Sequence, residues 1–163
     1  MLNSAYLTLS NEDTMITWQF LPFSQLTTTQ LYQLLKLRVD IFVVEQTCPY
    51  PELDDKDHQP GVHHLLGYQD DQLIACARLL PKGLSYPSVS IGRVAILETK
   101  RGGTGHQLMA QALKHCESLW PGETIEIGAQ KHLADFYGKH GFVQTSSMYL
   151  EDDIPHIDMK LKK

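Results

Sequence analysis

The residues best suited to chemistry lie in a basic, glycine-rich turn, Lys100-Arg-Gly-Gly-Thr-Gly105. An apolar stretch precedes this turn and an amphipathic stretch follows it, so several backbone N–H groups should stay unpaired at a helix N-terminus. The helix dipole favours negative charge at that position. Glycines let a ligand approach the backbone closely, and Lys100 and Arg101 add positive charge. The turn therefore predicts a pyrophosphate site; an ordinary strand-to-helix turn is the alternative.

The common nucleotide-binding motifs fit this turn poorly. A P-loop ends in Gly-Lys followed by Ser or Thr, whereas this turn ends in Thr104-Gly105-His106. A dinucleotide fingerprint needs a further glycine, but Leu stands at position 108, and the turn lies in the middle of the chain rather than after its first strand. The turn by itself does not name the nucleotide.

Composition restricts the class of protein. The chain has 163 residues, of which 42% are hydrophobic and 20% are charged, as expected of one soluble domain with a buried core. The formal net charge of −5 argues against a general nucleic-acid surface and suits a cationic substrate. Cys48, Cys76 and Cys116 form no CxxC pair, so we expect no disulfide framework, no metal site and a cytoplasmic location. No apolar run predicts a membrane span or a signal peptide.

Apolar spacing predicts the elements that position the turn. Residues 1–14 look like a polar N-terminal extension, and residues 15–163 look like one domain. We expect strands over 16–20, 63–69, 72–80, 88–97, 124–129, 142–149 and 156–161, and helices from Thr27 or Thr28 to Phe42, from the turn to Trp120 and over 131–140. Asp70-Asp71 should be the turn of a hairpin.

The strand over 88–97 has an irregular apolar pattern. Val89 and Ile91 fall on odd positions, but Val94 and Ile96 fall on even ones. This change of phase predicts a β-bulge at Gly92-Arg93, and burial of both strand faces is the alternative. The strand–helix–strand order over 88–129 predicts a right-handed crossover and a parallel pair, whereas the hairpins predict antiparallel pairs. The expected fold is α/β (α+β), with a mixed sheet and helices on both faces.

These residues resemble the GNAT superfamily of acyl-CoA-dependent N-acetyltransferases over about residues 15–161. The resemblance rests on Gly92-Arg-Val-Ala-Ile96, on Arg101-Gly-Gly-Thr-Gly105 and on Ala134-Asp-Phe-Tyr-Gly-Lys-His-Gly-Phe142. Within the superfamily, the chain is similar to the ElaA-like subgroup, through Met15-Ile-Thr-Trp18, Leu37-Arg-Val-Asp-Ile-Phe-Val-Val-Glu-Gln46, Cys48-Pro-Tyr50, Gly128-Ala-Gln130 and Ile154-Pro-His156.

The resemblance implies a mostly antiparallel, twisted sheet of about six to seven strands whose central parallel pair splays apart. It also implies acetyl-CoA as the acetyl donor and an amine as the acceptor, with no metal. The cofactor-binding residues would be Val94, Ala95 and Ile96 for the pantetheine, and Arg101, Gly102, Gly103, Thr104, Gly105 and His106 for the pyrophosphate. One feature differs: the superfamily loop reads Arg-Gly-x-Gly-x-Gly, and this loop is one residue shorter, which predicts an altered pocket or a reduced affinity for the cofactor.

Transfer of an acetyl group to an amine needs a proton acceptor and an acid for the departing thiolate. Tyr137 matches the superfamily tyrosine that protonates the sulfur, although its helical position would also suit a core residue. Glu45 is the first candidate for the base. His64 and His156 are alternatives, because histidine titrates near neutrality.

The segment 45–61 is long for a loop and should line the acceptor side of the site, with Tyr50, Asp54 and Asp57 as candidate substrate-binding residues. A solvated surface connection is the alternative. Arg78 and Arg93 lie within apolar strands, so we expect them to form buried ion pairs with this acidic segment.

Two other functions remain open. Arg38, Phe42, Asp54, Asp57 and Arg78 also resemble acyl-homoserine-lactone synthases, which are longer. The shortened loop is compatible with an acetyl-CoA-binding module that has no catalytic activity. The sequence names neither the acceptor nor the oligomeric state, for which a monomer and a homodimer are both compatible.

Overall fold

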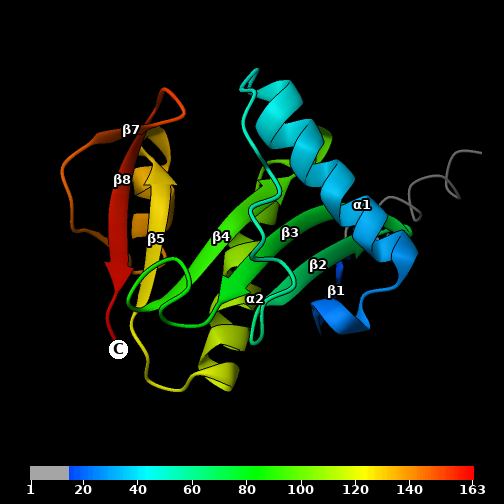
Figure 1. The fold of residues 1–163 in the computed structure, drawn as a ribbon, viewed down its shortest axis with the longest axis horizontal. Helices are drawn as coiled ribbons and strands as arrows, with labels where there is room; N and C mark the ends of the chain where they lie inside the picture. The colour runs from blue at the N-terminus through cyan, green and yellow to red at the C-terminus, as the bar shows by residue number, and fades with distance from the viewer. Residues whose placement is uncertain (1–14) are drawn as a thin grey trace, which may run out of the picture.

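An open sheet of eight strands runs through the computed structural model, which describes residues 15–163 (Figure 1). The strand order is β1-β2-β3-β4-β5-β8-β6, with β7 also paired to β8, and only the β4–β5 pair is parallel. The strands are β1 Thr17–Pro22, β2 His63–Gln69, β3 Gln72–Leu80, β4 Val89–Ile96, β5 Ile125–Gln130, β6 Val143–Gln144, β7 Tyr149–Glu151 and β8 Ile154–Leu161. The predicted polar extension, residues 1–14, lies outside the described residues.

Helices cover both faces of the sheet, as predicted (Figure 1). Helix α1, Thr28–Val39, packs on one face, and α2, Thr104–Leu119, and α3, Ala134–Gly138, pack on the other. Alternate side chains of one strand therefore enter different cores: Leu65 packs with α2, whereas Leu66 packs with α1. Short 3₁₀ turns occupy Phe23–Gln25, Glu98–Lys100 and Lys131–Leu133.

Local sequence signals explain several element ends. Thr27 caps α1 in a capping box with Gln30, in which each side chain accepts a hydrogen bond of 3.0 Å from the other residue's backbone N–H. Asp70 and Asp71 adopt φ values of +50° and +62° in the tight turn between β2 and β3. Both predictions are confirmed.

Two predicted elements differ from the structure. The helix expected to reach Phe42 ends at Val39 and continues as a π-helix, η3, over Asp40–Glu45. The strand expected over 142–149 divides into β6 and β7, because the Ser146 hydroxyl accepts the Asp158 backbone N–H at 2.9 Å in place of a strand carbonyl. The expected count of about six to seven strands therefore becomes eight.

The predicted bulge and splay are both present. Cys76 pairs with Ala95 and Arg78 pairs with Gly92, so two residues of β4 lie opposite Ala77, and Arg93 adopts a φ of +51°. β4 and β5 pair only at Val89–Ile125 and Ser90–Glu126 and then diverge (Figure 1). A bulge bends its strand and increases the local twist, so it directs β4 away from β5 at this point.

Candidate active site

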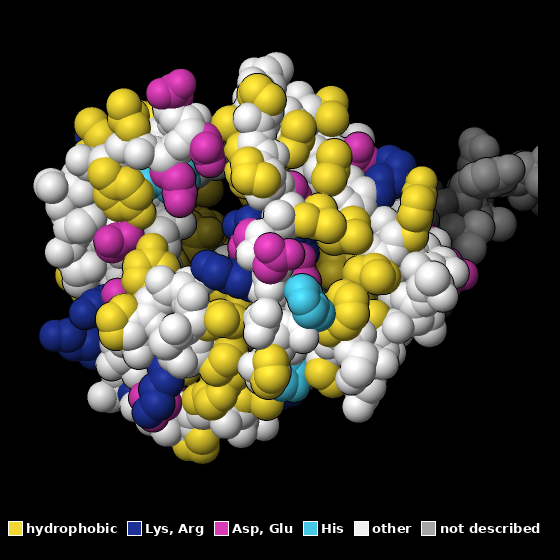
Figure 2. Space-filling view, viewed as in Figure 1, with side chains coloured by type: hydrophobic (Ala, Val, Ile, Leu, Met, Phe, Trp, Pro, Cys, Tyr) yellow, Lys and Arg dark blue, Asp and Glu magenta, His cyan; other side chains and the backbone are white. Residues whose placement is uncertain are grey.

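The divergence of β4 and β5 opens a cleft of about 890 Å³, which is visible as the hollow in the space-filling view (Figure 2). The bulged half of β4 forms one wall and β5 forms the other. The π-helix and the glycine turn meet beside the β4 wall, and residues of β7 and β8 extend the β5 wall. All of the lining residues lie between Ile41 and His156 in the sequence.

The glycine turn presents the N-terminus of α2 to the cleft. Gly102 and Gly103 adopt φ values of +107° and +101°, and among the described residues no side chain caps the helix. Both glycines and His106 line the cleft, and the Nδ1 atom of His106 lies 2.9 Å from Nε2 of His140. An uncapped N-terminus of a 16-residue helix offers free N–H groups and a favourable dipole to an anion. These residues fit the pyrophosphate of an acyl-CoA.

Gly105 is required for close packing rather than for its backbone angles. A Cβ atom at this position would lie 3.2 Å from the Phe136 ring and 3.3 Å from the Ile96 side chain. The first turn of α2 can therefore lie close against β4 and against α3, the helix that carries Tyr137.

Arg101 closes the glycine-turn side of the cleft with its side chain. Its Nη2 atom lies 2.8 Å from Glu45 Oε2, and its Nε atom donates to the Ile96 carbonyl at 3.2 Å. The carboxylate that was the first candidate for the base is thus ion-paired beside the glycine turn. An anion bound there would compete with Glu45 for Arg101.

The π-helix determines which of its side chains reach the cleft. Gln46 N donates to the Ile41 carbonyl and Cys48 N to the Val43 carbonyl, both with the five-residue spacing of a π turn. The extra residue per turn rotates the following side chains, so Phe42, Glu45 and Gln46 all line the cleft. Helical periodicity could not predict this shift.

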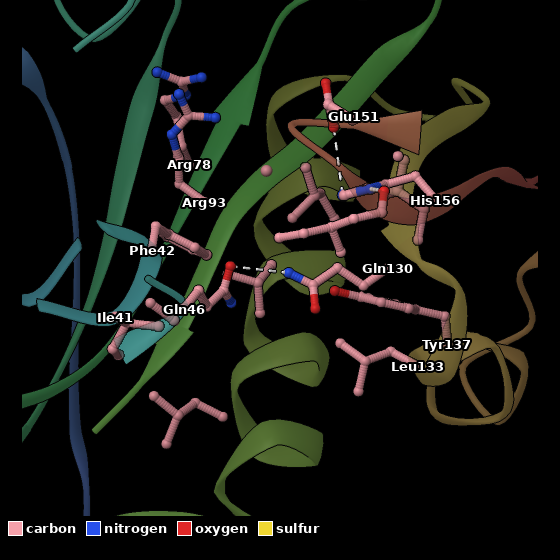
Figure 3. A pocket seen from close by; sticks show the side chains of 18 of the residues that line it. Ile41, Phe42, Gln46, Arg78, Arg93, Gln130, Leu133, Tyr137, Glu151 and His156 are labelled. Atoms are coloured by element: carbon pink, nitrogen blue, oxygen red, sulfur yellow. Dashed lines mark hydrogen bonds and ion pairs between the residues drawn. The ribbon is translucent and has the colours of Figure 1, made fainter. Parts of the chain in front are cut away.

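Tyr137 enters the cleft from α3 (Figure 3). Its side chain is buried, and burial raises the pKa of the phenol to about 12. No other side chain within residues 15–163 hydrogen-bonds to its hydroxyl. The phenol therefore remains protonated at neutral pH and is available to a ligand.

Two contacts span the cleft between its walls. Gln130 Nε2 donates to Gln46 Oε1 at 3.3 Å (Figure 3), and the Cys48 thiol lies 3.6 Å from the Asp152 carbonyl. The segment after the π-helix thus bridges to β5 and to the β7–β8 turn. The glutamine pair was not among the predicted site residues, although both glutamines lie in the segments that carry the family resemblance.

His156 lies in the cleft wall next to Glu151 (Figure 3). Its Nδ1 donates to the Ile154 carbonyl at 2.7 Å, and its Nε2 lies 3.3 Å from Glu151 Oε2. Since a carbonyl only accepts, Nδ1 carries a proton, and Nε2 is the ring nitrogen that faces the Glu151 carboxylate. Nε2 is therefore the atom that could take up a proton, and Glu151 would stabilise the resulting charge.

His64 lies in a different environment. It is 1% exposed and does not line the cleft, its Nε2 lies 3.0 Å from the Asp57 carbonyl, and burial lowers its pKa. A base must reach the proton that it removes, so this geometry gives no support to the expectation that His64 is catalytic.

Asp57 belongs to a buried ion-pair network rather than to the cleft surface. It contacts Arg38 at 2.7 Å and Arg78 at 3.0 Å, and Arg78 also contacts Asp54 at 2.7 Å. Burial alone would raise the pKa of both aspartates, but the neighbouring arginines outweigh that effect and hold both pKa values below the ordinary value. The expectation that Arg78 is a buried ion-pair partner is confirmed, whereas Asp57 does not line the cleft.

Arg93 extends the same network toward the cleft. Its Nε lies 2.6 Å from Glu52 Oε2, its Nη2 lies 3.3 Å from Asp54 Oδ2, and its guanidinium carbon lies 5.8 Å from the centre of the Tyr50 ring. Burial raises the pKa of Tyr50 to about 12. The expected ion pairing of Arg93 is confirmed, and Tyr50 and Asp54 line the cleft.

The structure thus brings most of the predicted site residues to one cleft. Those that line it are Glu45, Tyr50, Asp54, Val94, Ala95, Ile96, Arg101, Gly102, Gly103, Gly105, His106, Tyr137 and His156. Thr104 is buried at the start of α2 and, like His64 and Asp57, is not part of the lining. Within residues 15–163, no three His, Cys, Asp or Glu side chains are arranged to hold a metal ion.

Known proteins that resemble this chain have the fold and family that its sequence motifs indicate. Residues 39–163 match the family model described as an acetyltransferase (GNAT) domain. The chain is 45% identical over 146 residues to Protein ElaA of Escherichia coli K12, which covers 89% of this chain and 95% of ElaA. This chain therefore belongs to the GNAT acyltransferase family and is ElaA-like.

Solved structures show the same fold. The E. coli ElaA structure matches with a TM-score of 0.86 and 44% identity, covering 91% of this chain and 100% of that one. An acyl-CoA N-acyltransferase from Pseudomonas aeruginosa matches with a TM-score of 0.86 and 45% identity, covering 90% and 99%. The acyl-homoserine lactone synthase BjaI, at 20% identity, a TM-score of 0.71 and coverage of 91% and 82%, shares the fold alone. No helix within residues 15–163 has the length and apolar character needed to span a membrane.

Proposed function

We propose that this protein transfers the acetyl group of acetyl-CoA directly to an amine acceptor. The observation that carries the proposal is the cleft between the splayed β4 and β5, which has an uncapped helix N-terminus at one end and the unpaired Tyr137 hydroxyl inside it. The first feature suits a pyrophosphate and the second suits a departing thiolate.

The cofactor would be held mainly by backbone groups. Gly102, Gly103 and the first turn of α2 would bind its phosphates. Val94, Ala95 and Ile96 follow the bulge on the open edge of β4, where backbone groups that face β5 have no strand partner. Pantetheine amides could pair with that edge as a further strand would.

Two side chains would move the protons. An acyl-CoA supplies the acetyl thioester. His156 Nε2 takes a proton from the acceptor amine as the new C–N bond forms, and Tyr137 gives its phenolic proton to the sulfur as the C–S bond breaks. Both groups return to their starting states through exchange of a proton with solvent.

Glu45 is an alternative base. Its carboxylate lies in the cleft but is ion-paired with Arg101, so the geometry favours His156. The lactone-synthase alternative is weakened because the residues behind that resemblance, Arg38, Asp54, Asp57 and Arg78, pair with one another.

The test is release of CoA thiol from acetyl-CoA by the full chain, measured with a thiol reagent across a panel of small amines and lysine peptides. Calorimetric titration of acetyl-CoA is measured in parallel. Amine-dependent thiol release is the expected result. Tight binding of acetyl-CoA without release of CoA thiol in the presence of any amine would favour the non-catalytic acetyl-CoA-binding module. Formation of a lactone from S-adenosylmethionine and an acyl donor would favour the acyl-homoserine-lactone synthase.

A further inference from the structure

Two tyrosine hydroxyls donate to one carboxylate oxygen near the end of the cleft at which β4 and β5 still pair. Tyr149 donates to Asp158 Oδ1 at 2.7 Å, and Tyr86 donates to the same atom at 3.0 Å. The three residues come from β7, from the β3–β4 connection and from β8. This cluster has no part in the acetyl transfer described above.

A glycine makes room for the cluster. Gly128 pairs with Asp158 across β5 and β8, and a Cβ atom at Gly128 would lie 2.7 Å from the Tyr86 hydroxyl and 3.2 Å from the Tyr149 hydroxyl. Gly128 and Tyr86 line the cleft. The missing side chain therefore leaves room for both hydroxyls, and Asp158 and Tyr149, which do not line the cleft themselves, are held next to Tyr86 by the shared hydrogen bonds.

The carboxylate carries the negative charge of the cluster. Burial, followed by the neighbouring Asp158, raises the pKa of Tyr149 to about 12, and the same causes raise the pKa of Tyr86 further. Both phenols therefore stay protonated and donate, while their oxygen lone pairs remain able to receive a cation.

Ser90 provides an independent indication of a ligand. Its side chain is 2% exposed, it lines the cleft, and its Oγ has no hydrogen-bond partner among the described residues. Ser90 is the last residue of β4 that pairs with β5 before the strands diverge. A buried hydroxyl without a partner is costly, so a polar ligand group at this end of the cleft would stabilise it.

Acidic side chains in the cleft lining favour a cation. Glu151 and Asp152, next to the β7–β8 turn, line the cleft, and acidic side chains border the hollow in the space-filling view (Figure 2). Arg78 and Arg93, which also line the cleft, are already paired with carboxylates. Lys56, which hydrogen-bonds to Ser85 at 2.9 Å, adds one positive charge to the lining.

We propose that Ser90, Tyr86, Tyr149 and Asp158 form a subsite for a second ammonium group of the acceptor. The inference rests on the proposed acetyl transfer and adds the class of acceptor. On β5, Gly128 pairs with Asp158 and Gln130 pairs with His156. Gly128 and Gln130 are two residues apart, so the backbone positions of Asp158 and His156 on β8 are roughly 7 Å apart. This separation matches the nitrogen-to-nitrogen distance of a short aliphatic diamine.

The test compares putrescine with n-butylamine, which has the same carbon chain but one amino group. We expect the wild-type protein to acetylate putrescine with the lower KM. The Asp158→Asn variant keeps a carbonyl oxygen for the tyrosines but loses the charge, so the KM for putrescine should rise roughly 10- to 100-fold, with a smaller change in kcat. Asp71→Asn, in the β2–β3 turn outside the cleft, is the matched control and should keep the preference for putrescine.

A titration calorimetry experiment without acetyl-CoA separates the two proposals. If no amine is acetylated but putrescine binds the wild type and binds Asp158→Asn at least about tenfold more weakly, the subsite stands and the acetyl transfer fails. If amines are acetylated with no preference for putrescine, or if Asp158→Asn leaves that preference intact, the subsite is overturned and the acetyl transfer stands. Should Asp158→Asn unfold, as judged by circular dichroism, Tyr149→Phe is expected to reduce the preference severalfold, and an unchanged preference in that variant also overturns the subsite.

Discussion

At the scale of single residues, the surroundings decide the roles of identical side chains. His64 and His156 are both histidines on strands, but the ring of His64 is enclosed beside the arginine network, whereas His156 borders the cleft with its Nε2 next to Glu151. Burial lowers the pKa of His64 and disfavours its charged form. From the sequence, both histidines are equally suitable candidates for the base, and only their environments in the fold distinguish them.

Removing the Tyr137 hydroxyl should affect the chemical step more than binding. We expect Tyr137→Phe to lower kcat about 100-fold, because no other acid would protonate the sulfur, and to leave the acetyl-CoA dissociation constant within about threefold. Thiol release and calorimetric titration measure the two quantities. An unchanged kcat would show that Tyr137 is only a packing residue.

The identity of the base can be tested by comparing two variants. We expect His156→Gln to lower kcat/KM about 100-fold, since the side chain that accepts the proton of the amine is lost. Glu45→Gln should instead tighten acetyl-CoA binding by roughly two- to fivefold, because Arg101 loses a partner that competes with phosphate. If Glu45→Gln lowers kcat/KM about 100-fold and His156→Gln does not, Glu45 is the base.

At the scale of elements, irregular backbone directs the functional groups. The β4 bulge opens the sheet, the π-helix turns Gln46 into the cleft, and the glycine turn points the α2 N-terminus at the same space. Gly102 and Gly103 make two consecutive left-handed steps, which close a turn that is one residue shorter than the superfamily pattern. The reduced cofactor affinity expected from this shortening stays a prediction.

A side chain at Gly103 should strain the turn without any clash. Its φ of +101° is unfavourable for an L-residue, although a Cβ atom there would meet nothing within 4 Å. We expect Gly103→Ala to lower the free energy of unfolding by about 1–3 kcal/mol, measured by urea denaturation. Gly138→Ala in α3, where a Cβ also meets nothing, should instead raise it by about 0.5–1 kcal/mol. Equal effects of the two variants would contradict this account.

At the scale of the whole molecule, one buried network of ion pairs joins distant parts of the chain. It connects α1, the segment after the π-helix, β3 and the β4 bulge, and it consists of Arg38, Glu52, Asp54, Asp57, Arg78 and Arg93. The positive and negative charges are equal in number, so the network adds no net charge to the cleft wall. It holds the segment around residues 52–57 against the sheet.

Breaking this network should cost far more than breaking a surface ion pair. Asp57→Asn leaves Arg38 and Arg78 without a shared carboxylate, and we expect a loss of about 3–5 kcal/mol in the free energy of unfolding. Asp40→Asn, which removes the exposed pair with Lys36, should cost less than about 1 kcal/mol. Urea denaturation measures both, and similar losses would show that the network is not structurally important.

The same groups predict that acid destabilises the protein. The pKa of His64 is lowered from 6.5, so its neutral form stabilises the fold, and that contribution is lost as the pH falls below 6.5. The pKa values of Asp54 and Asp57 are lowered from 3.8, so their contribution is complete above that pH and is lost below it.

The urea midpoint should therefore fall between pH 7.5 and 5.5 and fall further toward pH 3. His64→Gln should reduce the first decrease, whereas His132→Gln, at an exposed position, should retain it. A midpoint that does not change with pH would contradict the assignment of His64 as buried and neutral.

The sequence by itself determined the order and kind of most elements, because apolar periodicity reports which face of an element is buried. The hairpin around Asp70-Asp71, the Thr27 cap and the bulge at Gly92-Arg93 are all local signals, and the structure confirms them. The glycine turn and the Tyr137 helix were predicted to share one site, and both line the cleft.

Only the tertiary structure decided which polar residues meet. Arg101 and Glu45 are 56 positions apart, Gln46 and Gln130 are 84 apart, and Tyr86 and Asp158 are 72 apart. No local pattern relates such pairs, because their contact depends on strand order, on the splay of β4 from β5 and on the π-helix that shifts side-chain direction. The sequence motifs indicated the family, but the side-chain contacts across the cleft form only when the chain folds.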